Sequence, residues 1–192
     1  NSLYELLPDL KYVNPDKFFA ELNKYSDTNL AGEITLFLNL SMQRKRLIFE
    51  QRERLNAVIG ILSSFELKSN KIMIFHENVD SLSNLDDLIN ATTHFSSGIM
   101  SSKKTTHSLN EFKNGRINVM LSVKMLLEGV DVPDCETAII AASSSSVRQK
   151  IQTVGRAIRK NPNIALKKIY NIYISETVDE TIFSKVNWEE IF

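Results

Sequence analysis

The hydrophobic positions in the first third of the chain recur at helical spacing. Asparagine, proline and aspartate at residues 14–16 form a helix-start signal, which predicts a helix from Lys17 onward. Ser41 is predicted to cap a longer helix, whose apolar stripe extends over residues 47–62. The opposite face of this helix is charged and includes Arg54. We interpret it as a solvated face with i, i+4 ion pairs, and a nucleic-acid contact is the less favoured interpretation.

From residue 70 onward, short apolar runs alternate with amphipathic runs, which predicts strands that alternate with helices. Strands are predicted at residues 71–75, 92–95, 117–121, 137–142 and 169–174. Helices are predicted at residues 79–89, 102–113, 147–158 and 177–185. This alternation is typical of an α/β domain, in which helices cover both faces of a parallel sheet. We therefore expect a helical linker or accessory segment at residues 1–68 and an α/β domain at residues 69–192.

The net charge of zero hides a basic block. Residues 103–168 contain 12 Lys and Arg against 5 Asp and Glu, and both flanking regions are acidic. A basic block of this kind predicts one surface that faces a polyanion, although ordinary charge scatter also produces such blocks. The single cysteine excludes an internal disulfide and fits a reducing compartment. No apolar run approaches the roughly 18–20 residues that a membrane span needs.

Candidate chemistry begins with a Q-x-x-G-R-x-x-R run at residues 152–159. Gln152, Arg156 and Arg159 follow the i, i+4, i+7 spacing, so a helix would place all three on one face. A guanidinium binds phosphate through two parallel hydrogen bonds, which makes a phosphate the natural ligand. A solvated helix face with two chance arginines is the alternative for such a run taken alone. Three scattered histidines predict no metal site.

Several features precede this run in a recognisable order. They are the strand at 71–75, Ser96-Ser97-Gly98, Phe112-Lys113-Asn114-Gly115, and the loop Gly129-Val130-Asp131-Val132-Pro133. With the Q-x-x-G-R-x-x-R run, this order resembles the second RecA-like domain of superfamily 2 helicases. The resemblance covers residues 70–175 and implies a parallel-sheet, RecA-like fold of the P-loop NTPase type. Taken alone, the loop at 129–133 could be a plain turn.

Within that superfamily, the chain is most similar to the branch of XPB-type repair helicases and restriction-enzyme DNA translocases. The sequence of residues 126–134 and the serine tract at 143–146 are similar to those of that branch. DEAD-box RNA helicases usually have histidine where this chain has Gln152. The resemblance therefore implies DNA as the partner, bound through its backbone without regard to sequence.

The resemblance also implies roles for individual residues. Arg156 and Arg159 would be arginine fingers that reach the γ-phosphate of ATP, bound with Mg²⁺ mainly by a separate N-terminal RecA-like domain. Gln152 would position and couple these groups. Gly129 would let the backbone approach the nucleotide closely, and Asp131 would bind the ribose hydroxyls or order a water.

Two further pairs of residues are implied to contact the nucleic-acid backbone. Ser122 and Lys124 follow the predicted strand at 117–121, where this family contacts nucleic acid. Ser97 and Gly98 are expected in a second loop, with backbone N–H groups suited to phosphate. Ser122 departs from the family pattern, because many relatives have threonine there.

Nothing in the sequence matches G-x-x-x-x-G-K-[ST], the loop that cradles phosphates. We therefore expect the C-terminal half of a larger ATP-dependent DNA helicase or translocase, located in the cytoplasm, at the nucleoid or in the nucleus according to the organism. A non-catalytic module that binds nucleic acid or protein is the alternative. A Rossmann-type domain is disfavoured, because no G-x-G-x-x-G follows the first strand.

Overall fold

The computed structural model describes residues 3–13, 17–25, 27–65, 71–100, 105–123, 135–142 and 168–184 of the 192-residue chain. The chain forms two compact units, residues 1–46 and residues 47–192. The boundary between them falls inside helix α3 (Ala31–Phe49). The predicted division into a helical segment at 1–68 and a separate domain at 69–192 stays a prediction.

The first unit is a small helical bundle with a core of its own. Besides the start of α3, it contains α1 (Leu3–Leu6), the 3-10 helix η1 (Pro8–Tyr12) and α2 (Phe18–Asn23). Its core consists of the buried side chains Leu7, Leu10, Leu22 and Ile34. The helix predicted from Lys17 onward is confirmed as α2, whereas the start signal at 14–16 lies outside the described residues.

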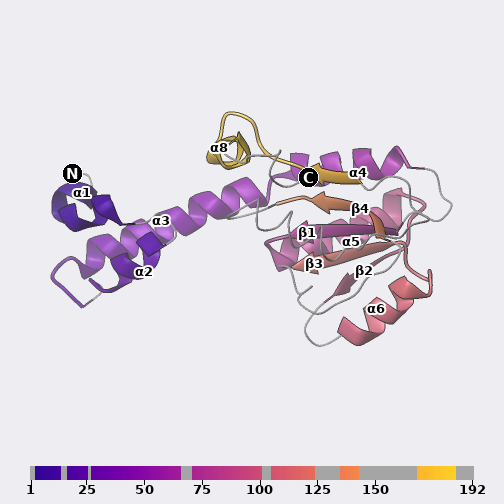
Figure 1. Ribbon diagram of the computed structural model, residues 1–192, viewed down its shortest axis with the longest axis horizontal. Coiled ribbons are helices and arrows are strands. Elements are labelled where there is room, and N and C mark those ends of the chain that lie inside the picture. The colour runs from indigo at the N-terminus through magenta and orange to yellow at the C-terminus, as the bar shows by residue number, and fades with distance from the viewer. Residues whose placement is uncertain are drawn as a thin grey trace. The chain divides into compact units, whose positions relative to one another are not determined.

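The second unit is a parallel sheet with helices (Figure 1). Its helices are α4 (Arg52–Ser63), α5 (Val79–Thr92), α6 (Thr105–Lys113) and α8 (Val178–Ser184). Its strands are β1 (Lys71–His76), β2 (Ser97–Met100), β3 (Val119–Val123), β4 (Cys135–Ile140) and β5 (Lys168–Asn171). The strand order is β2-β3-β1-β4-β5, and every described pairing is parallel. The predicted α/β class is confirmed.

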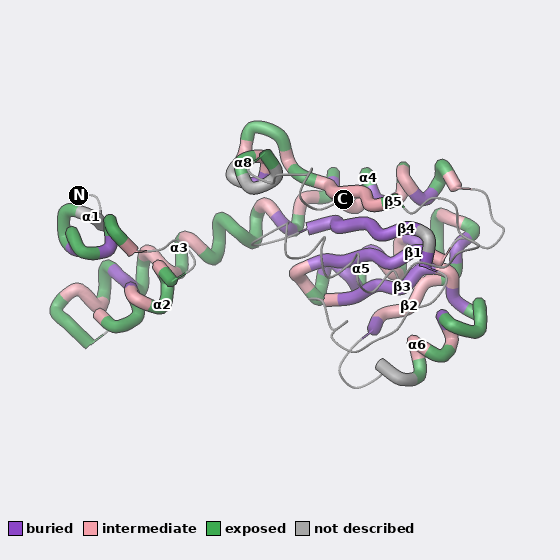
Figure 2. The backbone as a smooth tube through the Cα atoms, viewed as in Figure 1, coloured by how far each residue is buried: buried purple, intermediate pink, exposed green. Residues whose placement is uncertain are grey.

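The central strands are buried on both faces, as parallel strands usually are. One face forms a single core with helices α4 and α5. Its buried members include Val58, Leu62, Ile72, Ile74, Leu82, Leu85, Ile89, Val119, Leu121 and Ile139. The alternate residues of β1 and β3, Met73 and Met120, are also buried. Figure 2 shows the resulting continuous buried colour along β1 and β4.

Two element predictions are wrong. The strand expected at 92–95 does not form, because α5 continues to Thr92 and the Thr93 hydroxyl donates to the Ile89 carbonyl at 2.8 Å. Phe95 is buried in the core, so its hydrophobicity serves packing and not strand pairing. The helix expected to begin at Ser41 is two helices. The first, α3, begins at Ala31, so Ser41 lies inside it and is not its cap, and it ends at Phe49; the second, α4, begins at Arg52.

Candidate functional site at the carboxyl edge of the sheet

The strands β1, β3 and β4 end at the same edge of the sheet. Phe75, near the end of β1, pairs with Ser122 of β3 and with Ile140 of β4. In open parallel sheets, ligands bind outside this carboxyl edge. In the sequence, β3 is followed by residues 124–134 and β4 leads into residues 143–167, and these two segments contain most of the predicted site residues.

Most predicted site residues lie outside the described part of the chain. Lys124, Gly129 and Asp131 follow β3 in the sequence, and Gln152, Arg156 and Arg159 follow β4. Their roles stay predictions.

Ser122 lies at the carboxyl edge, as expected, but inside a strand. It is the fourth residue of β3, which ends at Val123, and it pairs with Met100 of β2 as well as with Phe75. Its side chain is buried. The predicted strand at 117–121 is confirmed with a shift toward the C-terminus, and this shift places Ser122 within the sheet.

The expected loop around Ser97 and Gly98 is wrong. Both residues belong to β2 and lie at its amino end, opposite the edge where ligands bind. The Ser97 hydroxyl donates to Asp86 Oδ1 at 2.5 Å, and the Ser97 N–H donates to the Asn90 side chain at 3.1 Å. A Cβ on Gly98 would come within 2.9 Å of Ile117 Cδ1. The pair therefore fixes β2 against its neighbours.

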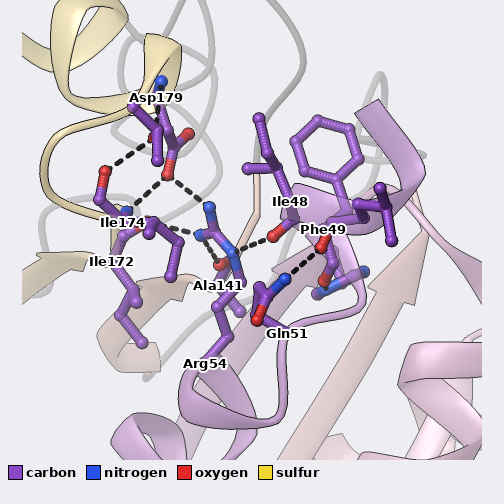
Figure 3. A network of polar contacts seen from close by, with 11 residues as sticks. Ile48, Phe49, Gln51, Arg54, Ala141, Ile172, Ile174 and Asp179 are labelled. Atoms are coloured by element: carbon purple, nitrogen blue, oxygen red, sulfur yellow. Dashed lines mark hydrogen bonds and ion pairs between the residues drawn. The ribbon is translucent and has the colours of Figure 1, made fainter. Parts of the chain in front are cut away.

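Arg54 is the residue that sequence reasoning missed. It lies in the first turn of α4, yet its side chain is 0% exposed. Its guanidinium donates from Nε to the Ile48 carbonyl at 3.0 Å, and from Nη1 to the carbonyls of Ala141 at 2.6 Å and Ile172 at 2.9 Å. Nη2 forms an ion pair with Asp179 (Figure 3). The interpretation of Arg54 as part of a solvated face is wrong.

Asp179 completes this network from the C-terminal side. It is buried in the first turn of α8, and its Oδ2 also accepts a hydrogen bond from the Ile174 N–H at 2.8 Å. The carboxylate thus receives one charged donor and one backbone donor. Such pairing is what a buried carboxylate requires, because the cost of removing its charge from water must be offset.

The end of helix α3 is tied to the same edge of the sheet. The last carbonyls of a helix have no partner inside it. Here the Leu47 carbonyl accepts from Gln51, the Ile48 carbonyl from Arg54 and the Phe49 carbonyl from His76. All of these residues belong to the second unit. Side chains of Gln51, which precedes α4, of Arg54 in α4 and of His76 in β1 therefore supply the hydrogen bonds that the helix end lacks.

His76 is the last residue of β1 and is held as a neutral imidazole. Its Nδ1 accepts from the Asn78 N–H at 3.0 Å, so its Nε2 has the proton and donates to the Phe49 carbonyl at 3.2 Å. The pKa of His76 is lowered to about 4, mainly by burial and also by the charge of Arg54, while the hydrogen bond to the Phe49 carbonyl acts in the opposite direction.

This lowered pKa predicts a pH-dependent stability. Because the unfolded histidine takes up its proton near pH 6.5 and the folded one only near pH 4, the contribution of His76 is complete above pH 6.5. It is lost as the pH falls toward 4. Between pH 7 and pH 4.5, wild type should lose roughly 2–3 kcal/mol of unfolding free energy more than His76→Gln. Urea unfolding at both values measures this, with His94→Gln as the exposed control. Equal losses of unfolding free energy in wild type and His76→Gln would contradict this prediction.

Among the described residues, every helix is too short or too polar to span a bilayer. The same residues contain no group of three His, Cys, Asp or Glu side chains arranged to hold a metal ion.

A sequence signal for Arg54 does exist. Arg54, Val58 and Leu62 are spaced four residues apart, and all three are buried on one face of α4. Following the four-residue spacing back from Leu62 and Val58 would have placed Arg54 on the buried face. No comparable spacing points to Asp179, whose role depends on contacts with residues far away in the sequence.

Comparisons with known proteins identify the family to which the chain belongs. Residues 42–161 match the model of the helicase conserved C-terminal domain. The chain is 25% identical over 121 residues to the ATP-dependent RNA helicase DBP3 of Candida glabrata, covering 58% of this chain and 22% of that protein. It is 38% identical over 58 residues to the DNA 3'-5' translocase XPB2 of Sulfurisphaera tokodaii, covering 30% and 13%.

Among solved structures, the yeast DEAD-box splicing factor Prp28 shares the fold with a TM-score of 0.57 at 16% identity, over 72% of this chain and 31% of that chain. This likeness confirms the RecA-like fold. The aligned regions span less than a third of each of these relatives. The family model spans more than half of the present chain, including both segments that follow β3 and β4 as far as residue 161. The chain therefore belongs to the helicase conserved C-terminal domain family of superfamily 2.

Proposed function

We propose that this chain is the C-terminal half of an ATP-dependent superfamily 2 helicase or translocase that acts on DNA. The observation that supports this most is the extent of the family match, which includes the Q-x-x-G-R-x-x-R run at 152–159. That run follows β4 in the sequence, and β4 ends at the carboxyl edge of the sheet.

In this proposal, ATP and Mg²⁺ are held mainly by a separate N-terminal RecA-like domain. Arg156 and Arg159 reach the γ-phosphate when the two domains close, and they stabilise the negative charge that develops in phosphoryl transfer. Gln152 positions these groups, while Gly129 and Asp131 contact the nucleotide. The two domains close when ATP binds and reopen after hydrolysis. Each such cycle moves the domain formed by this chain along one strand of the nucleic acid.

Nucleic acid is proposed to bind at the carboxyl edge, through Lys124 and the backbone near Ser122. The basic block at 103–168 supplies further positive charge. Ser97 and Gly98 are not assigned to this contact, because β2 places them at the opposite end of the strand. Binding that depends on phosphates is insensitive to sequence and strongly sensitive to salt.

DNA is favoured over RNA on one observation. The chain contains Gln152 where DEAD-box RNA helicases usually have histidine. RNA is the competing partner, because DBP3 is named as an RNA helicase.

The test is ATP hydrolysis by the natural protein that contains this chain, measured with Mg²⁺ and with DNA or RNA of the same sequence. We expect DNA to stimulate hydrolysis more than RNA, with an apparent affinity that falls steeply between about 50 and about 200 mM salt. Residues 1–192 alone should add no hydrolysis. Stimulation by RNA only would replace DNA by RNA in the proposal. No stimulation by either would favour a non-catalytic binding module.

A further inference from the structure

At the carboxyl ends of β4 and β5, the guanidinium of Arg54 donates hydrogen bonds to backbone carbonyls, as a backbone N–H of a neighbouring strand does within the sheet. The ladder between β4 and β5 ends at Ile140 and Asn171. At the next residue of each strand path, the carbonyls of Ala141 and Ile172 both accept from Arg54 Nη1, at 2.6 Å and 2.9 Å. One nitrogen therefore joins the two strand ends where backbone pairing stops (Figure 3).

The N–H groups of the same two residues remain within the sheet. The Ala141 N–H donates to the Phe75 carbonyl of β1, and the Ile172 N–H donates to the Ile140 carbonyl of β4, both at 2.9 Å. Each residue is thus held by the sheet through its N–H and by Arg54 through its carbonyl. The backbone at Ala141, just after β4, is therefore fixed by β1 through its N–H and by Arg54 through its carbonyl.

Stability alone does not explain an arginine at this position. A buried ion pair is often no better for stability than well-packed apolar side chains of similar volume. What only arginine provides is a rigid, planar fork that can reach the Ile48 carbonyl, two strand ends and the Asp179 carboxylate at once. Among the described residues, every buried side-chain nitrogen and oxygen has a hydrogen-bond partner.

We infer that Arg54 is a positioning residue for ATP hydrolysis. It fixes the carboxyl ends of β4 and β5, and through them the point from which the chain continues toward Gln152, Arg156 and Arg159. This inference rests on the proposed function. It assigns Arg54 no contact with ATP or nucleic acid.

Hydrogen exchange of this chain tests the anchoring. The variants are Arg54→Met, the nearly isosteric Asp179→Asn, and Arg52→Met as an exposed control on the same helix. Because Arg54→Met and Asp179→Asn remove or weaken hydrogen bonds from a charged group, we expect both to accelerate exchange at the amides of Ala141 and Ile172 by on the order of tenfold or more relative to Val119, and Arg52→Met to leave it unchanged. The Val119 amide bonds to Ser96 at the amino end of the sheet. Equal acceleration at all three amides would overturn the anchoring.

Steady-state ATP hydrolysis by the natural protein tests the positioning, at a temperature where each variant is fully folded. Arg54→Met should lower kcat by on the order of tenfold to 10²-fold with little change in KM for ATP, because misplaced groups weaken transition-state stabilisation. Arg54→Lys retains the charge but not the fork, so it should remain impaired. Full activity in Arg54→Lys, or normal kcat in Arg54→Met despite local exchange, would overturn the inference.

The two proposals fail in different ways. If the wild-type protein shows no hydrolysis stimulated by nucleic acid, the proposed function fails, and the catalytic part of the inference fails with it. If wild type is stimulated and the Arg54 variants match it, only the positioning role fails. The exchange experiment gives its answer in both cases, because it needs neither ATP nor nucleic acid.

Discussion

Replacing Arg159 by alanine is expected to lower DNA-stimulated ATP hydrolysis by about 10³-fold or more, the scale on which an arginine finger acts. The transition state of phosphoryl transfer spreads negative charge over the oxygens of the γ-phosphate. A guanidinium placed beside those oxygens stabilises that charge more than the charge of bound ATP, so its loss lowers kcat. The measurement is steady-state hydrolysis by the natural protein at saturating ATP and DNA.

A matched control separates this effect from loss of basic charge. Arg148→Ala removes a positive charge from the same basic block, outside the Q-x-x-G-R-x-x-R run, and we expect it to hydrolyse ATP nearly normally. Both variants should bind DNA with similar affinity. Normal hydrolysis by Arg159→Ala would reject the finger assignment and favour a domain that binds without catalysis.

The second large effect is expected from Arg54→Met, which should reduce the free energy of unfolding by about 3–5 kcal/mol. Removing the guanidinium leaves the Asp179 carboxylate buried with only the Ile174 N–H as its described donor. The Ile48, Ala141 and Ile172 carbonyls lose a donor at the same time. Since domains are stable by only about 5–15 kcal/mol, this loss is a large share of the total.

Urea unfolding of the chain, followed by circular dichroism, measures this loss. Arg52→Met is the control, because Arg52 is exposed and its replacement should change stability by less than about 0.5 kcal/mol. Asp179→Asn should fall between the two, since an amide oxygen can still accept hydrogen bonds. Equal midpoints for the Arg54 and Arg52 variants would show that the buried network contributes nothing.

The strands of this domain could be predicted because their apolar runs are buried on both faces. Residues 71–75 and 137–142 contain such runs, and both form central strands. The edge strand β2 escaped prediction, because Ser97 and Gly98 have little preference for strands. The pairing of β2 with β3 over Ser97–Met100 determines its structure, and such pairing is not visible in the local sequence.

The polar network at the carboxyl edge could not be predicted in the same way. Local patterns treat an arginine as a surface residue, because arginine is almost never fully buried without a partner. The partners of Arg54 come from the ends of β4 and β5 and from α8. Only the assembled sheet brings these groups together, so the sequence could indicate the burial of Arg54 at most.

The distance in sequence between Arg54 and its partners also constrains the order of folding during synthesis. The Ala141 carbonyl comes 87 residues after Arg54, the Ile172 carbonyl 118 and the Asp179 carboxylate 125. At about 5–20 residues per second, a ribosome needs roughly 6–25 s to make this stretch. A nascent chain that ends at Asn171 contains every strand described here, yet its Arg54 still lacks the carboxylate that neutralises it. We therefore expect the network around Arg54 to close only after α8 has left the ribosome.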